Sequence, residues 1–146
     1  MKMTVTASFI CLLALSAQAQ VLTRPGDVRK LTDDVMQEIC KTNYNGGLDM
    51  LKPYSFLSSA EIDTIETTLK AQLPKIEPNY GKILGSELVS QKQIRDSLLS
   101  LNYLLRMEKF ALRWTFTFYN GSKGWNLVYI DCNDKLLALF YGDVTN

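Results

Sequence analysis

The sequence predicts an α+β domain in which N-terminal helices pack on a curved antiparallel sheet. Between Val28 and Leu73, apolar residues recur at steps of three and four, as on one face of a helix. Between Phe110 and Tyr119, apolar and polar residues alternate, as on a strand with one buried face. Helical patterns come first, strand patterns follow, and no internal repeat interrupts them. The two kinds of element are therefore expected in separate layers of one domain.

The first helix is expected to begin at Pro25-Gly26-Asp27. Its apolar stripe consists of Val28, Leu31, Val35, Met36, Ile39 and Cys40. The segment Asn43-Tyr44-Asn45-Gly46-Gly47 is expected to end this helix, since glycine readily adopts positive φ. A short turn over residues 48–52 should then stop at Pro53.

A second helix is expected to begin after Ser58 or Ser59, either of which can cap its first turn. Glu61 and Asp63 lie in that turn, where the helix dipole favours negative charge. The buried stripe consists of Ile62, Ile65, Leu69 and Leu73. Pro74 and Pro78 are expected to break or kink the segment, and Tyr80-Gly81 closes it.

Strands are expected over residues 82–94, 98–107, 110–119 and 125–131, with a short last strand over 135–141. The alternation is clearest in the third strand, where Phe110, Leu112, Trp114, Phe116 and Phe118 share one face. Trp114 is therefore expected in the core. Asn120 to Gly124 is expected to form a hairpin loop.

Residues 1–19 have the organisation of a secretory signal peptide. Lys2 precedes an apolar run from Phe9 to Leu15, and Ala17-Gln18-Ala19 forms a small-residue cleavage site. The run is too short to span a bilayer, and the bulky Phe9 and Ile10 before Cys11 do not suit a lipoprotein box. We expect residues 20–146 to be a single exported domain, periplasmic or secreted. The alternative is a cytosolic chain with an apolar first helix.

Charge and composition narrow the classes of function. Without Lys2, basic and acidic residues are equal in number, so the excess positive charge that favours nucleic-acid binding is missing. The chain contains no histidine, which removes the commonest general base and metal ligand. Neither a metal nor a cofactor is therefore expected. Cys40 and Cys132 remain after cleavage; they could pair in an oxidising compartment or stay as free buried thiols.

The chain resembles the NTF2-like, or cystatin-like, superfamily of cone-shaped α+β domains. The resemblance is carried by Tyr80-Gly81-Lys82 before the first long strand, the aromatic strand from Ala111 to Tyr119, the glycine loop, and Gly124-Trp125. It spans roughly residues 28–140, and the chain looks especially like small secreted bacterial members of unknown function. It implies a curved sheet around the helices, with an apolar cavity at its open end. The catalytic motifs of the enzymatic members have no counterpart here.

The candidate ligand-binding residues are aromatic or charged side chains expected on or beside the sheet. They are Tyr54, Tyr80, Glu87, Tyr103, Arg113, Trp125, Tyr129 and Asp131. Arg113 would bind an anionic group if its face lines the cavity, or would lie outward beside an acid or a ring. Glu87 and Asp131 would perform acid–base chemistry only if they faced each other; otherwise they are exposed or salt-bridged acids.

The leading hypothesis is an exported, non-catalytic domain. It would bind a small apolar or acidic ligand, or a protein partner, in or near the cavity, or would form a homodimer through the sheet. One alternative is an isomerase- or hydrolase-type enzyme that uses Tyr with Asp or Glu in the cavity. The other is an accessory or inhibitor protein of the cell envelope.

Overall fold

The computed structural model describes residues 21–141, and the expected signal peptide lies outside this range. Three α-helices come first: α1 (Pro25–Cys40), α2 (Tyr44–Asp49) and α3 (Ser59–Tyr80). A short 3-10 helix, η1 (Lys52–Tyr54), precedes α3. The strands are β1 (Ile83–Ile94), β2 (Leu98–Met107), β3 (Ala111–Gly121) and β4 (Gly124–Asn133), and α4 (Ala138–Tyr141) follows them. The predicted α+β class is therefore confirmed.

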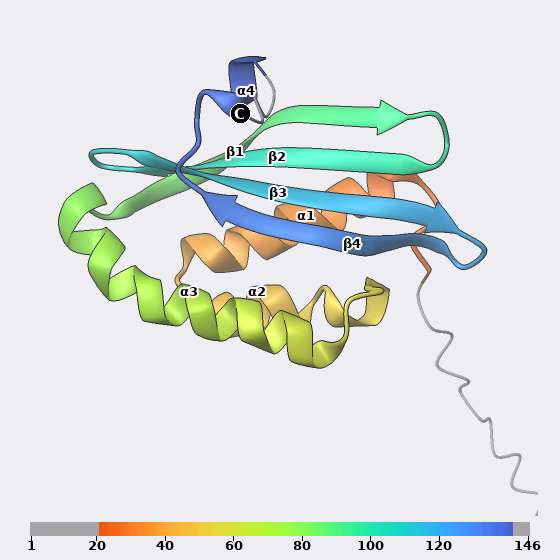
Figure 1. The fold of residues 1–146 in the computed structure, drawn as a ribbon, viewed down its shortest axis with the longest axis horizontal. Coiled ribbons are helices and arrows are strands. Elements are labelled where there is room, and N and C mark those ends of the chain that lie inside the picture. The colour runs from red at the N-terminus through yellow and green to blue at the C-terminus, as the bar shows by residue number, and fades with distance from the viewer. Residues whose placement is uncertain (1–20, 142–146) are drawn as a thin grey trace, which may run out of the picture.

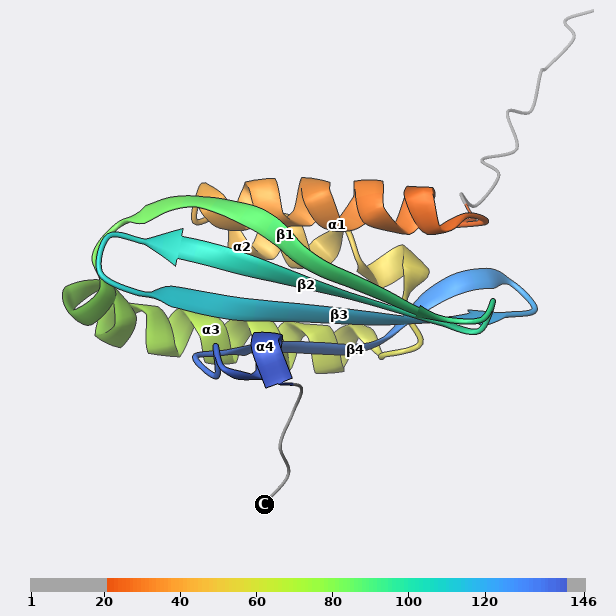
Figure 2. The same cartoon turned by 90° about the horizontal axis from the view of Figure 1, so that it is seen from above.

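The four strands form one open antiparallel meander in the order β1-β2-β3-β4. Helices α1, α2 and α3 cover one side of it, and α4 lies on the other side from α1 (Figures 1 and 2). Leu101 is paired with Phe116, and Tyr103 with Trp114, so these residues share one face of the sheet. We call this the core face. The opposite face, which carries Arg113, is the outer face.

The core lies between the core face and the helices. Trp114 is 1% exposed and Phe116 is fully buried, which confirms the predicted core position of Trp114. From α1, Val35 and Ile39 are fully buried in the same hydrophobic core. Phe110, expected on the same face, is 41% exposed because it lies before β3, outside the paired strand. Its ring packs beside that of Tyr80 at a centroid separation of 4.9 Å.

The glycine pair does not end the first helix, contrary to expectation. Helix α1 ends at Cys40, and Thr42 takes the positive φ of 62°. Asn43 then caps α2, its side chain accepting a hydrogen bond from the Gly46 amide at 3.2 Å. A Cβ on Gly47 would lie 3.1 Å from the Val35 carbonyl oxygen, so this glycine lets α2 approach α1 closely.

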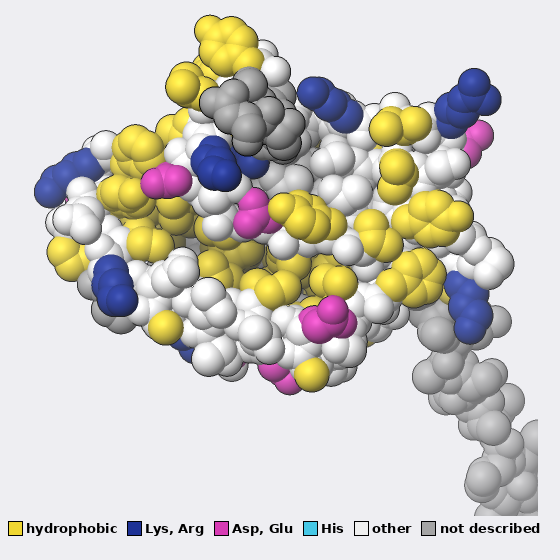
Figure 3. All heavy atoms as spheres, viewed as in Figure 1, with side chains coloured by type: hydrophobic (Ala, Val, Ile, Leu, Met, Phe, Trp, Pro, Cys, Tyr) yellow, Lys and Arg dark blue, Asp and Glu magenta, His cyan; other side chains and the backbone are white. Residues whose placement is uncertain are grey.

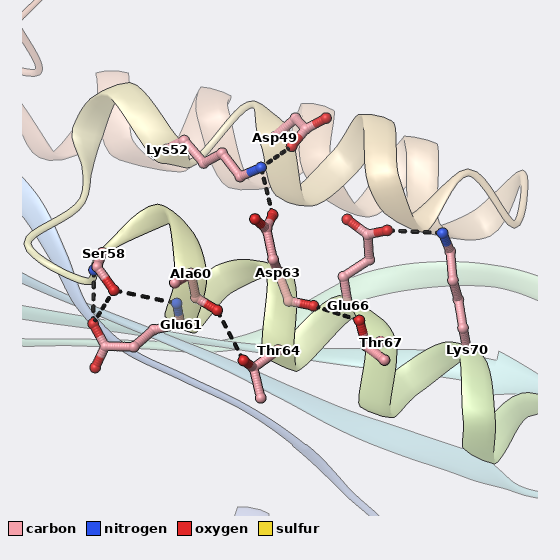
Figure 4. Close-up of polar contacts among 10 residues, drawn as sticks. All are labelled: Asp49, Lys52, Ser58, Ala60, Glu61, Asp63, Thr64, Glu66, Thr67 and Lys70. Atoms are coloured by element: carbon pink, nitrogen blue, oxygen red, sulfur yellow. Dashed lines mark hydrogen bonds and ion pairs between the residues drawn. The ribbon is translucent and has the colours of Figure 1, made fainter.

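Of the expected break or kink at the prolines, the break is absent, since α3 runs through both to Tyr80. Each proline removes only one backbone donor from a helix of 22 residues, and the flanking turns stay helical. The predicted start is confirmed at Ser58, whose Oγ accepts from the Glu61 amide at 3.2 Å. The Glu61 carboxylate in turn accepts from the Ser58 amide at 2.7 Å (Figure 4). Gly81 ends the helix with φ of 79°.

Two further boundaries differ from expectation near the C-terminus. The β3–β4 turn is tighter than predicted, because Gly121 pairs with Gly124 and the latter accepts a φ of 78°. The predicted last strand is a short helix, α4. The chain turns between β4 and α4, where the Asn133 side chain accepts a hydrogen bond from the Lys135 amide at 2.9 Å.

Candidate functional site

A cavity of about 260 Å³ lies between α3 and the core face. Figure 3 shows an apolar hollow between the sheet and α3. We call it the α3 cavity. Its lining residues are Tyr44, Leu69, Gln72, Ile76, Tyr80, Ile83, Leu105, Met107, Leu112, Trp114, Cys132, Asn133 and Asp134. Most of these are apolar, which is typical of small-molecule sites.

Regular side-chain spacing builds both walls of the cavity. Along α3, residues 69, 72, 76 and 80 follow each other at steps of three and four and therefore share one helix face. On the sheet, Leu105 of β2 is paired with Leu112 of β3. Alternation along β3 then places Trp114 on the same side. The cavity is thus framed by regular elements, which hold its lining residues in fixed positions.

Ion pairs attach α3 to the element before it. Lys52 Nζ lies 2.5 Å from Asp49 Oδ1 and 2.7 Å from Asp63 Oδ1, joining α2 and η1 to the first turns of α3 (Figure 4). Glu66 pairs with Lys70 at 2.7 Å. Asp49, Asp63 and Glu66 are close enough to hold a cation. Lysine ammonium groups already neutralise these carboxylates, so the trio is explained as an ion-pair network.

Two of the residues that line the cavity each carry a buried polar atom without a hydrogen-bond partner in the described part of the chain. The Tyr44 hydroxyl and the Trp114 indole nitrogen Nε1 are both buried, and neither makes a hydrogen bond. Tyr44 is 5% exposed and Trp114 is 1% exposed. A buried polar group without a partner costs about 1–3 kcal/mol, so two beside one cavity require an explanation.

The electrostatics of the cavity favour neutral groups. Burial, with smaller contributions from Glu77 and the two cysteines, raises the pKa of Tyr44 to about 12. Burial, together with Asp131, raises the pKa of the Cys132 thiol to about 12. Both groups are therefore protonated near neutral pH. Asp134 is the charged lining residue, and neither Lys nor Arg lines the cavity among residues 21–141.

Cys40 and Cys132 both carry free thiols in the structure. Of the two alternatives left open by the sequence, the structure therefore shows the unpaired one. Cys132 lines the α3 cavity, whereas Cys40 packs against the hydrophobic core from α1.

Of the aromatic candidates, Tyr80 alone is among the described residues that line the α3 cavity. Tyr54 lies in a groove beside Leu22 and α1, and Tyr129 lies in a shallow depression beside the start of α3. The Tyr103 hydroxyl donates to Asp33 Oδ1 at 2.7 Å inside the fold. Trp125 is 2% exposed, and its amide donates to the Leu22 carbonyl at 2.8 Å.

The charged candidates lie on the outer face, away from the α3 cavity. Glu87 and Arg113 are both paired with Leu104 of β2, and Arg113 is largely buried there. Asp131 is paired with Thr115 and accepts a hydrogen bond from the Asn133 side chain. Glu87 and Asp131 lie on the two edge strands, three strand spacings or about 14 Å apart, so they do not form a facing pair.

The candidate set drawn from the sequence did not include Tyr44 or Trp114. Trp114 was predicted only as a core residue. Tyr44 was predicted to lie in the segment that ends the first helix, whereas the structure places it in the separate helix α2. One signal in the sequence does point to the cavity. The apolar stripe of α3 extends past Leu69 to Ile76 at helical spacing, beyond the proline at which a break was expected.

The groove at Tyr54 is larger, about 600 Å³, but its polar walls are already paired. Lys30 binds Asp34 at 2.8 Å, and Asp27 binds Arg24 at 2.9 Å. Their charges are satisfied by each other and exposed to water, so they offer a ligand little gain. The α3 cavity is therefore the stronger candidate site.

No family model matches the chain, and comparisons with curated proteins and with solved structures return no match. Among the described helices, none is both long and apolar enough to cross a membrane. What the α3 cavity can bind therefore follows from its own chemistry.

Proposed function

We propose that this protein is an exported binding domain that takes up a small apolar molecule in the α3 cavity. The observation that carries the proposal is an apolar cavity beside two buried, unpartnered polar groups, Tyr44 Oη and Trp114 Nε1. Apolar walls supply affinity by removing ligand surface from water, and a few polar groups fix orientation. The proposal agrees with the cavity that the NTF2-like resemblance implies.

Binding without catalysis is the better supported form of this proposal. The acids considered for acid–base chemistry, Glu87 and Asp131, lie on strands whose side chains there face away from the cavity. The titratable groups of the cavity, Tyr44 and Cys132, have pKa values raised to about 12. Groups that remain protonated at neutral pH are poor general bases.

The test uses the neutral apolar dye N-phenyl-1-naphthylamine, whose fluorescence increases in an apolar site. Gln72 lies on α3, is exposed and lines the cavity, so Gln72→Trp should obstruct its mouth without disturbing the core. Ala71 is its exposed neighbour and does not line the cavity, so Ala71→Trp is the matched control. We expect saturable dye binding to the natural chain and to Ala71→Trp, and its loss in Gln72→Trp.

The exposed apolar residues of α4 make the control necessary. Leu137 and Phe140 are 71% and 78% exposed and could hold dye on the surface. Surface binding would persist in Gln72→Trp. Equal dye uptake by the two variants, or no uptake by the natural chain, would contradict the proposal.

A further inference from the structure

The two unpartnered polar groups of the α3 cavity restrict the kind of ligand it would take, given that the cavity binds a small molecule as proposed above. The indole Nε1 of Trp114 can only donate a hydrogen bond. The Tyr44 hydroxyl can donate or accept, and its raised pKa keeps the proton on the oxygen at neutral pH. Both groups can thus be satisfied by acceptor atoms on one ligand.

The charge of the cavity excludes an anionic acceptor. Asp134 lines it, and Glu77 is close enough to raise the pKa of Tyr44. No lysine or arginine lines it within the described range, and Arg113 projects from the opposite face of the sheet. A carboxylate would lose its hydration there without meeting a cation, which is costly.

We propose that the ligand class is an uncharged, mostly apolar molecule with a hydrogen-bond acceptor, such as a ketone, ester or tertiary amide, held by Tyr44 and Trp114. The apolar part would lie against Leu69, Ile76 and Leu112. The acceptor would remove the cost of leaving the two donors buried without partners. This class differs from the acidic ligand that Arg113 would bind if its face of the sheet lined the cavity.

The test compares three probes of similar size as competitors of N-phenyl-1-naphthylamine: butylbenzene, phenyl propyl ketone and phenylbutyrate. At neutral pH we expect the carboxylate to compete on the order of tenfold more weakly than the ketone. In Tyr44→Phe and in Trp114→Phe, the affinity of the ketone relative to butylbenzene should fall about fivefold, the equivalent of one hydrogen bond. The ratio is the readout, because Trp114→Phe also removes apolar ring surface from the cavity lining and so changes the affinity of butylbenzene itself.

Tyr80→Phe is the matched control, because Tyr80 lines the same cavity but is partly exposed, so water can satisfy its hydroxyl. It should leave the ketone-to-hydrocarbon ratio unchanged. Thermal unfolding of each variant verifies that the fold is retained. If all probes bind but neither Tyr44→Phe nor Trp114→Phe changes the ratio, or if phenylbutyrate binds best, the ligand class is wrong and cavity binding stands. If dye and probes all fail to bind, the proposed function itself fails.

Discussion

The hydroxyl of Tyr103 on β2 lies 2.7 Å from Oγ1 of Thr32 on α1, in the buried interior. The same hydroxyl donates to Asp33 Oδ1 at 2.7 Å. These contacts join the first helix to the centre of the sheet. They also engage the hydroxyl of Tyr103, which was one of the candidate ligand-binding residues. Tyr103 therefore stabilises the fold, with its polar atom already satisfied.

Replacing Tyr103 with phenylalanine should destabilise the protein by about 1–2 kcal/mol. The change removes a hydrogen bond to a partly exposed carboxylate while keeping the buried ring. Chemical denaturation of both chains measures the free energy of unfolding. Tyr119→Phe is the control, because Tyr119 is 45% exposed and should change stability by less than about 0.5 kcal/mol. Equal effects of the two substitutions would show that the Tyr103 contacts contribute nothing specific.

Trp114→Ala should cost about 3–5 kcal/mol, the usual range for a large aromatic residue removed from a core. Trp114 is 1% exposed and stacks on Phe116 at a centroid separation of 6.1 Å. Phe110→Ala should cost much less, since Phe110 is 41% exposed. Urea unfolding of both variants checks the order. A loss of less than about 1 kcal/mol at Trp114 would contradict its core position.

Ser58→Ala should destabilise the protein by about 1 kcal/mol, because it removes the side-chain acceptor that caps α3. Ser59→Ala should have almost no effect, since Ser59 is an exposed residue one position inside the helix. Thermal melting of the two single variants makes the comparison. If the two melting temperatures fall equally, the cap does not lie at Ser58.

Alkaline pH should weaken the fold through Cys132. Its pKa in the folded state is raised to about 12 from an ordinary value near 9. Above pH 9 the unfolded chain therefore binds fewer protons than the folded one, and the free energy of unfolding falls as pH rises towards 12. Tyr44 acts in the same direction.

Cys132→Ser should reduce this pH dependence, since serine does not ionise in that range. Denaturant unfolding at a series of pH values between 8 and 11 provides the measurement. In the natural chain, the thiol of Cys132 should also react slowly with thiol reagents near neutral pH and faster as pH rises. A thiol that reacts at neutral pH as fast as free cysteine would contradict the raised pKa.

Export should remove the leader after Ala19, because small residues at positions 17 and 19 frame the predicted cleavage site. Mass spectrometry of protein recovered from the cell envelope or medium should then detect a chain that begins at Gln20. Ala19→Asp should block or displace cleavage, because signal peptidase requires a small residue there. A natural chain recovered with Met1 in place would refute the expectation.

The α+β class, the order of helices and strands, and the core face of β3 could all be predicted from the amino-acid sequence. These features follow from periodicity, since a period of two along 110–119 and steps of three and four along 28–40 each select one buried face. The start of α3 was predicted to within one residue, at Ser58 or Ser59, because capping depends on local residue types.

The position of the candidate site, in contrast, depends on how the elements pack in three dimensions. Whether Arg113 or its neighbour Trp114 faces the cavity depends on which face of β3 the helices cover, because successive residues of a strand point to opposite faces. Gly47 lets α2 pack closely against α1 at Val35, and local propensity cannot predict such a contact between two segments. The residues that line the α3 cavity likewise come from α2, α3 and all four strands. Tyr44 and Trp114 therefore line the same cavity only in the folded chain.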